Sequence, residues 1–199
     1  MGRNTTNTKL NKRTRIIDGA IEVFAKMGFY NAKISMIAKA AGVADGTIYL
    51  YFKSKDDLLI SIFEEKMTMV MDVHLGALAD CDSATTKLQT FARVHLNLIK
   101  NNPALAELLQ IELRQSTKFM KDYHHERFLS YLNIIGDIIY EGIDSGEFRS
   151  DINISVGKII FFGALDEFAT QWILNQPKNI SIEEAGDQIC KMFISGLKK

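Results

Sequence analysis

The sequence predicts an all-α protein built from nine helices, and three features of the chain indicate this class. Apolar residues recur at intervals of three and four along most of the 199 residues, which is the spacing of one helix face. No segment alternates between apolar and polar residues for long enough to indicate a strand. The chain has only two prolines, Pro103 and Pro177, and both lie where a helix is expected to begin or end.

The first part of the chain predicts three helices behind a short tail. Residues 1–10 are polar, and we expect them to form a disordered basic tail. Glycines mark where the first two helices end, because glycine commonly follows the last helical residue. The expected helices run from about Asn11 to Met27, from about Ile34 to Ala41, and from about Ala44 to Phe52.

Six further helices are expected, and capping residues mark the start of several. Ser54 is expected to cap a long helix whose first turn carries Asp56 and Asp57, because carboxylates stabilise helix N-termini. Ser83 begins the next helix, and Asn102 caps the one after it. The expected ranges are 56–79, 83–100, 102–119, 122–144, 152–175 and 181–197. The helix at 152–175 is apolar on nearly all sides, which predicts burial on most of its faces.

The zero net charge of the chain conceals an asymmetry. Residues 1–55 hold ten Lys/Arg and three Asp/Glu, a charge of +7, and the remainder carries −7. A basic module on an acidic body favours nucleic-acid binding. The alternative is a basic disordered tail on an ordinary domain, but five of the ten cations lie beyond the tail and the first helical turns: Lys26, Lys33, Lys39, Lys53 and Lys55.

Composition and motifs argue against several other classes of protein. Cys81 and Cys190 lie far apart and outside any CxxC pattern, so we expect a reduced compartment, no disulfide framework and no zinc site. The four histidines lack helix-turn spacing, which favours structural or solvated histidine over metal binding. The N-terminal residues lack the apolar core of a signal peptide, and no apolar run reaches the roughly 18 residues of a membrane helix. We therefore expect a cytoplasmic protein without a resident cofactor or membrane contact.

A glycine-containing turn between the second and third helices fits a helix-turn-helix, in which the third helix enters the DNA major groove. Gly46 leaves room for the backbone to approach DNA closely, and Thr47 suits a phosphate or a thymine methyl group. Tyr49 and Tyr51 project rings with polar tips, whereas Ile48 and Phe52 are expected to face inward. Lys53 and Lys55 are expected to contact phosphates, which position the protein without specifying sequence.

The stretch from Arg15 to Leu58 resembles the DNA-binding domain of the TetR family of transcriptional repressors. The resemblance rests on IIDGAIEVFAKMGF and KISMIAKAAGVADGTIYLYFKSKDDLL. It implies a homodimer that binds a palindromic operator in double-stranded DNA and releases it when a small molecule binds. The family's DNA contacts carry over to Lys33, Ser35, Asp45, Gly46, Thr47, Tyr49, Tyr51 and Lys53.

Asp45 departs from the family, which often has a lysine at this position. Because a carboxylate repels phosphate, Asp45 is expected to accept a hydrogen bond from a cytosine amino group instead. The resemblance also implies a division into a helix-turn-helix domain at 11–54 and a ligand-binding and dimerisation domain at 55–199.

The last two helices carry the broadest apolar surfaces, and exposing them would leave too large an apolar patch on a monomer. By analogy with the family, two helices from each subunit form a four-helix bundle. The expected dimer interface contains Ile160, Phe161, Phe168, Trp172, Ile189 and Phe193.

An apolar effector pocket is expected among the helices at 105–119, 122–144 and 155–172. Its expected apolar lining is Leu105, Leu109, Leu113, Phe128, Tyr131, Leu132, Ile135, Phe162 and Leu165. Glu112, Arg114, Asp166 and Glu167 interrupt this apolar pattern, and a buried charge needs a partner. Either Arg114 pairs with Asp166, or Arg114 binds an anion.

A narrower resemblance links most of the chain to the FadR-type regulators of fatty acid degradation within the same family. It is carried by VADGTIYLYFKSKDDLLISIFEEKM, ELRQS, YLNIIGDIIYEGIDSGE and FGALDEFATQWILN. It implies long-chain acyl-CoA as the effector. The cations available to the CoA phosphates are Arg93, Arg114, Lys118 and Arg127, although ordinary surface ion pairs explain each of them equally well.

The leading hypothesis is therefore a repressor of fatty-acid degradation genes that is released from DNA by long-chain acyl-CoA. A second hypothesis keeps the repressor but gives it a lipophilic drug or another amphiphile as effector, held by Tyr131, Trp172, Asp166 and Glu167. A third, a helical lipid carrier or enzyme without DNA binding, is disfavoured because no catalytic motif is present and because the charge is asymmetric.

Overall fold

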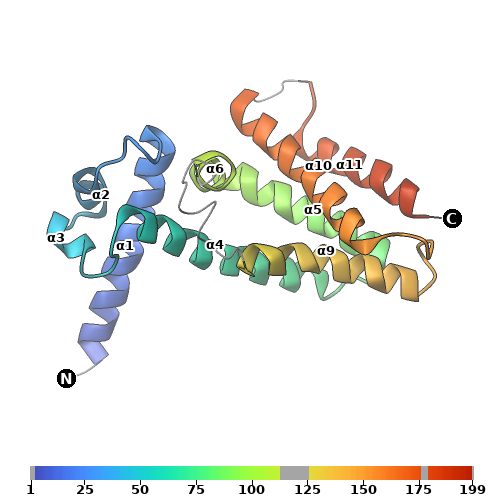
Figure 1. Cartoon of the computed structure of the whole chain (residues 1–199), viewed down its shortest axis with the longest axis horizontal. Coiled ribbons are helices and arrows are strands. Elements are labelled where there is room, and N and C mark those ends of the chain that lie inside the picture. Colours follow the sequence, from blue (N-terminus) through green and yellow to red (C-terminus); the bar gives the residue numbers. More distant parts are fainter. Residues whose placement is uncertain (1–2, 113–125, 176–178, 199) are drawn as a thin grey trace. The chain divides into compact units, whose positions relative to one another are not determined.

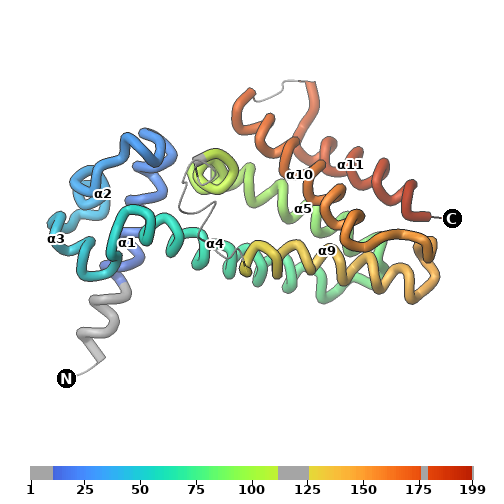
Figure 2. Tube along the Cα trace, viewed as in Figure 1, coloured from blue at the N-terminus to red at the C-terminus, as the bar shows by residue number. Residues whose placement is uncertain are grey.

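The computed structural model describes residues 3–112, 126–175 and 179–198, and within these ranges the chain forms helices and turns without a strand (Figure 1). The predicted all-α class is confirmed. The chain divides into two compact units, one made of Met1–Glu65 with Ala104–His124 and the other of Lys66–Pro103 with His125–Lys199. Figure 2 follows the chain through both units, and none of the described helices is long and apolar enough to cross a membrane.

The first unit is built around α1 (Arg3–Met27), α2 (Ile34–Ala41) and α3 (Asp45–Ile48), with the start of α4 (Lys55–Leu78). Short α6 (Pro103–Glu107) and a π-helical turn, η1 (Leu108–Glu112), complete the described part of this unit. Helix α1 begins at Arg3 rather than near Asn11, so the tail expected to be disordered is largely helical.

The sharp turn between α2 and α3 depends on Gly42, which adopts the left-handed conformation with φ 62°. The backbone N–H of Val43 donates to Ala38 O at 2.9 Å, which closes α2 in a Schellman-type cap. The guanidinium of Arg15, on α1, donates to the last carbonyls of α2, Ala41 O at 2.5 Å and Gly42 O at 2.9 Å. This bonding fixes the angle at which the chain enters α3.

Helix α3 is shorter than expected, since its regular part ends at Ile48 and a turn follows over residues 49–51. Phe52 nevertheless lies inward, as predicted, and its N–H donates to Ile48 O at 3.0 Å. The Ser54 cap of α4 is confirmed, because its Oγ accepts from the N–H of Asp57 at 3.0 Å.

The second unit contains the rest of α4 together with α5 (Ala84–Asn101), α9 (Glu126–Asp144), α10 (Ile154–Asn175) and α11 (Ile182–Leu197). Helix α5 contacts α9, α10 and α11, which gives the unit a shared core. Phe91, Tyr131, Phe161 and Leu165 are among its fully or almost fully buried side chains.

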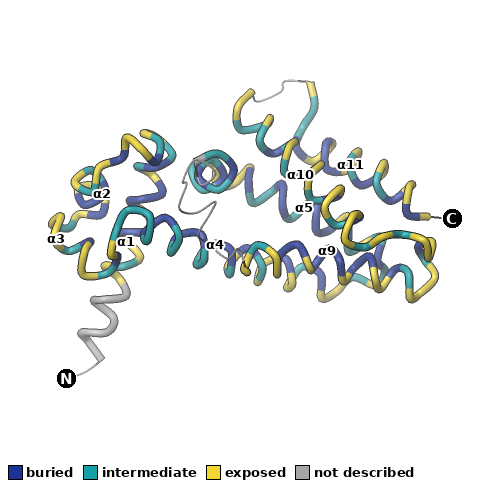
Figure 3. The backbone as a smooth tube through the Cα atoms, viewed as in Figure 1, coloured by how far each residue is buried: buried dark blue, intermediate teal, exposed yellow. Residues whose placement is uncertain are grey.

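Helix α10 differs from the expectation of burial on most faces. Its buried residues form one stripe at intervals of four, namely Gly157, Phe161, Leu165 and Ala169. Large apolar residues on its other faces are exposed in the single chain, including Val156, Ile159 and Ile160. Figure 3 shows α10 with exposed and intermediate stretches as well as buried ones. An apolar helix that its own chain buries on one stripe leaves a second apolar face for another partner.

Candidate DNA-binding surface and effector site

The residues expected to contact DNA lie mostly on the exposed side of α2, α3 and the turn after α3. Lys33, Ser35, Asp45, Gly46 and Lys53 are exposed, and Tyr49 is 59% exposed. Thr47 and Tyr51 are half-buried. Because Ile48 and Phe52 fill the core beneath them, this surface combines a fixed backbone with accessible polar tips.

Two residues on this surface have local geometry that bears on their expected roles. A Cβ added at Gly46 would meet nothing within 4 Å, so the space beside its Cα is open. Asp45 occupies the first turn of α3, where its carboxylate also stabilises the helix N-terminus.

Lys55 differs from the expected phosphate contact. Its ammonium donates to three backbone carbonyls of the α1–α2 connection, Phe29 O at 2.7 Å, Tyr30 O at 3.1 Å and Ala32 O at 3.1 Å. It also lies 4.6 Å from the centre of the Phe29 ring. An ammonium has three N–H bonds, so Lys55 has no donor left for phosphate and serves to hold the first unit together.

The second unit encloses a hydrogen-bonded network of three buried side chains, His74, Tyr131 and His95, each from a different helix. Nδ1 of His74, on α4, lies 2.8 Å from Val70 O, and its Nε2 lies 3.1 Å from the hydroxyl of Tyr131, on α9. The same hydroxyl lies 2.7 Å from Nδ1 of His95, on α5. Hydrogen bonds therefore join α4, α5 and α9 inside an apolar core.

Burial keeps the side chains of this network uncharged. Removal from water, together with the neighbouring His74, lowers the pKa of His95 to about 3. Burial also lowers the pKa of His74 to about 4, although its interactions with the backbone of Val70 and Phe91 oppose part of this change. Burial, together with the charge of Asp166, raises the pKa of Tyr131 well above its usual value. All three side chains are neutral at pH 7.

Several residues expected to line the effector pocket lie in the same unit, and Tyr131 belongs to the hydrogen-bonded network itself. Tyr131, Leu132, Ile135 and Leu165 are buried, while Phe128, Phe162 and Asp166 are half-buried. The Phe162 ring lies 5.3 Å from Phe128 and 5.9 Å from His95. Expected residues of α9 and α10 therefore meet within one unit, where Phe162 lies beside His95 of α5.

The remaining expected pocket residues are not brought to this place by the described part of the structure. Leu105 and Leu109 are half-buried residues of the other unit. Arg93 is exposed and donates to Thr90 Oγ1 at 3.5 Å, and Arg127 is exposed at the start of α9. Leu113, Arg114 and Lys118 lie outside the described residues, as does the side chain of Glu112.

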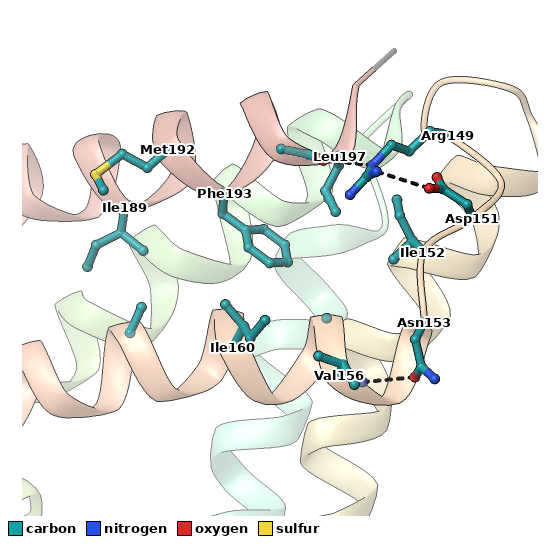
Figure 4. A pocket seen from close by; sticks show the side chains of 13 residues that line it. Arg149, Asp151, Ile152, Asn153, Val156, Ile160, Ile189, Met192, Phe193 and Leu197 are labelled. Atoms are coloured by element: carbon teal, nitrogen blue, oxygen red, sulfur yellow. Dashed lines mark hydrogen bonds and ion pairs between the residues drawn. The ribbon is translucent and has the colours of Figure 1, made fainter.

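A groove of about 540 Å³ runs between α10 and α11 (Figure 4). Three residues of the expected dimer interface line it, Ile160, Ile189 and Phe193, and Met192 beside them is 76% exposed. Phe168 and Trp172 are half-buried and lie 6.2 Å apart, ring centre to ring centre. The assignment of Phe161 was wrong: its side chain is fully buried and packs on Phe193 at 4.7 Å, so it belongs to the core of its own chain.

Both parts of the chain match families of bacterial regulators. Residues 16–62 match the family described as bacterial regulatory proteins, tetR family. Residues 63–196 match the family described as YsiA-like protein, C-terminal region. The chain belongs to the TetR family of transcriptional regulators.

Similar proteins extend over nearly the whole chain. The fatty acid metabolism regulator protein of Bacillus subtilis is 38% identical over 186 residues, which cover 94% of this chain and 95% of that protein. The crystal structure of FadR from Bacillus subtilis with stearoyl-CoA has a TM-score of 0.86 and 37% identity, and covers 92% of this chain and 98% of that one. FadR from Bacillus halodurans, a fatty acid degradation regulator, has a TM-score of 0.87 and 34% identity, with 94% and 96% covered.

Sequence reasoning missed the roles of His74 and His95, although it correctly favoured structural or solvated histidine. A signal was present: each histidine occupies an apolar stripe of its helix, four residues after Val70 and Phe91 respectively. A stripe position predicts burial, but it does not show that Tyr131 lies between the two rings.

The buried histidines predict that the protein loses stability in mild acid. Because their pKa values are lowered on folding, only the unfolded chain takes up protons as the pH falls below about 6.5. Their contribution to the free energy of unfolding is therefore complete above about pH 6.5. It is lost as the pH falls toward about 4 for His74 and about 3 for His95, at up to about 1.4 kcal/mol per pH unit for each histidine. Urea unfolding at pH 7.0 and 5.0 measures this change.

The control for this prediction is the double variant His74→Gln, His95→Gln. It is expected to be less stable at pH 7 and to show a shallower fall between pH 7.0 and 5.0. Equal pH dependence in the two proteins would contradict the assignment of the loss to these histidines.

Proposed function

We propose that this chain is a dimeric, cytoplasmic repressor of fatty-acid degradation genes that leaves its operator when a long-chain acyl-CoA binds. The observation that carries the proposal is the match to fatty acid regulators from two Bacillus species. The match covers nearly the whole chain, including the second unit, which is the proposed effector unit. The complex of one of them with stearoyl-CoA supports the choice of effector.

The exposed surface of α2 and α3 supports a role in reading DNA. Lys33 and Lys53 provide charge for phosphates, while Tyr49, Thr47 and Asp45 present groups suited to phosphates or base edges. In a dimer, each α3 enters one major groove, and the two half-sites are about 34–36 Å apart or at a related spacing.

Lys53 and Lys55 form a matched pair for testing this surface. Lys53→Met is expected to weaken binding equally to all DNA sequences and to reduce the slope of log affinity against log salt by about 0.9, because one phosphate contact is lost. Lys55→Met is expected to leave that slope unchanged and to cost about 1–3 kcal/mol of stability, because three carbonyls lose their charged donor.

The two effects are separated by fluorescence anisotropy on labelled DNA at several salt concentrations and by urea unfolding. The assignment fails if Lys55→Met lowers the salt slope while Lys53→Met does not.

The exposed apolar face of α10 and α11 supports the dimer. Ile160 is 56% exposed and lines the groove between these helices. Ile160→Glu is expected to place a charge at the centre of the interface and to shift the protein toward monomer, because an unpaired charge cannot be buried cheaply. Sedimentation velocity measures the shift.

The matched control is Val73→Glu, which changes an exposed apolar residue on α4. This variant is expected to sediment as the wild type does. If Ile160→Glu remains a dimer at micromolar concentration, this face is not the interface.

Release from DNA requires that the effector binds more tightly to the conformer that cannot bind the operator than to the conformer that can. A preference of about 100-fold, equivalent to about 2.7 kcal/mol, is enough for a useful change in operator occupancy. Helix α4 contributes residues to both units, so one continuous helix links the second, effector unit to the first, DNA-binding unit.

A thermal-shift titration with palmitoyl-CoA, palmitate and CoA tests the effector. Ligands that bind only the folded state raise the midpoint by mass action. We expect palmitoyl-CoA to stabilise the protein at micromolar concentration and CoA alone to have no effect. If none of the three shifts the midpoint and a cationic amphiphile such as hexadecyltrimethylammonium does, the second hypothesis replaces acyl-CoA.

A further inference from the structure

The network formed by His74, Tyr131 and His95 includes one polar atom that lacks a partner in the described part of the structure. Nε2 of His95 is sealed from solvent and has no hydrogen-bond partner among the residues that the structure describes. Such an atom costs about 1–3 kcal/mol when it is buried unpaired. A buried group left unpaired in this way therefore calls for an explanation.

The hydrogen bonds of the network determine whether Nε2 of His95 is a donor or an acceptor. Val70 O can only accept, so Nδ1 of His74 carries the proton and Nε2 of this neutral ring accepts from the Tyr131 hydroxyl. The Tyr131 oxygen then accepts from Nδ1–H of His95. With its proton on Nδ1, the neutral His95 ring presents Nε2 as an acceptor.

The surroundings of His95 are aromatic, and part of them is only half-buried. Phe91 lies parallel to the imidazole at 6.4 Å, and Phe162 meets it edge to face at 5.9 Å. Phe162 and its neighbour Phe128 are only half-buried, and both were expected to line the effector pocket. A rotamer change of Phe162 would expose the acceptor to a ligand that lies along these rings.

We propose that Nε2 of His95 accepts a hydrogen bond from a neutral N–H or O–H group of the effector, which makes His95 a specificity-determining residue. This inference rests on the proposed function. A saturated acyl chain has no such donor, whereas the thiol arm of CoA carries an amide N–H close to the thioester. The amide is therefore the expected donor, and a hydroxyl on the acyl chain is the other source of the same chemistry.

The same geometry disfavours a free fatty acid. An ionised carboxylate has only acceptors, so it cannot satisfy the lone pair of His95. The charge of Asp166 already acts on Tyr131 and would repel a second carboxylate there. His95 thus distinguishes a thioester with an amide-bearing arm from the corresponding acid.

Three small thioesters test the donor directly in the full-length protein. Palmitoyl-N-acetylcysteamine retains one amide N–H, S-ethyl palmitothioate has none, and S-ethyl 3-hydroxypalmitothioate carries a hydroxyl on the chain instead. Calorimetric titration is expected to give the amide compound about five-fold tighter binding than the S-ethyl compound, as one neutral hydrogen bond allows. Tighter binding of the hydroxy compound instead assigns the donor to the acyl chain.

Variants connect this preference to His95. His95→Phe keeps a ring but removes the acceptor, and the five-fold ratio is expected to fall to about one. Tyr131→Phe keeps the volume but removes the hydroxyl that holds the His95 proton on Nδ1, and the ratio is expected to fall partway. Far-UV circular dichroism confirms that each variant is folded before titration.

A second readout uses the wild type alone, so it does not depend on the variants folding. In ¹⁵N-labelled protein, His95 is expected as the Nδ1–H tautomer, and its Nε2 resonance is expected to move when the amide compound binds but not when S-ethyl palmitothioate binds. Equal affinities of the three thioesters, or an Nε2 resonance that no donor-bearing compound moves, would overturn the inference while the binding of palmitoyl-CoA upheld the proposed function. If the wild type does not bind palmitoyl-CoA, the proposed function fails and this inference fails with it.

Discussion

The hydroxyl of Tyr131 is the contact on which the effector unit depends. It joins His74 on α4 and His95 on α5 to α9, and all three side chains are removed from water. Burying groups of this kind in an apolar core costs free energy unless they are hydrogen-bonded. The packing of Phe91, Phe161 and Phe162 around this network keeps water out, and the exclusion of water keeps both histidines neutral.

The same constraint gives the unit a polar connection that reaches α4. In our account, an effector that pairs with His95 alters a series of hydrogen bonds that continues through Tyr131 to His74, and α4 itself continues into the DNA-binding unit. An apolar pocket alone would bind any lipophilic molecule of suitable length. A single acceptor in an aromatic wall adds the selectivity that such a pocket lacks.

Local rules predicted the helices well, because periodicity and capping act over a few residues. The caps at Ser54 and Ser83 and the inward positions of Ile48 and Phe52 required no knowledge of distant contacts. The errors arose where distant residues decide. Lys55 bonds to carbonyls of the α1–α2 connection, and Phe161 faces its own core although it neighbours the exposed Ile160. An apolar helix shows in its sequence that it needs partners, but not which face each partner covers.

The central claim is that an acyl-CoA controls the attachment of this protein to DNA. The most direct test is fluorescence anisotropy of the dimer on an operator selected from genomic fragments, titrated with palmitoyl-CoA at constant salt. Micromolar palmitoyl-CoA is expected to release the DNA, while equal concentrations of CoA and palmitate leave it bound. DNA that stays bound when palmitoyl-CoA saturates the protein would contradict the account.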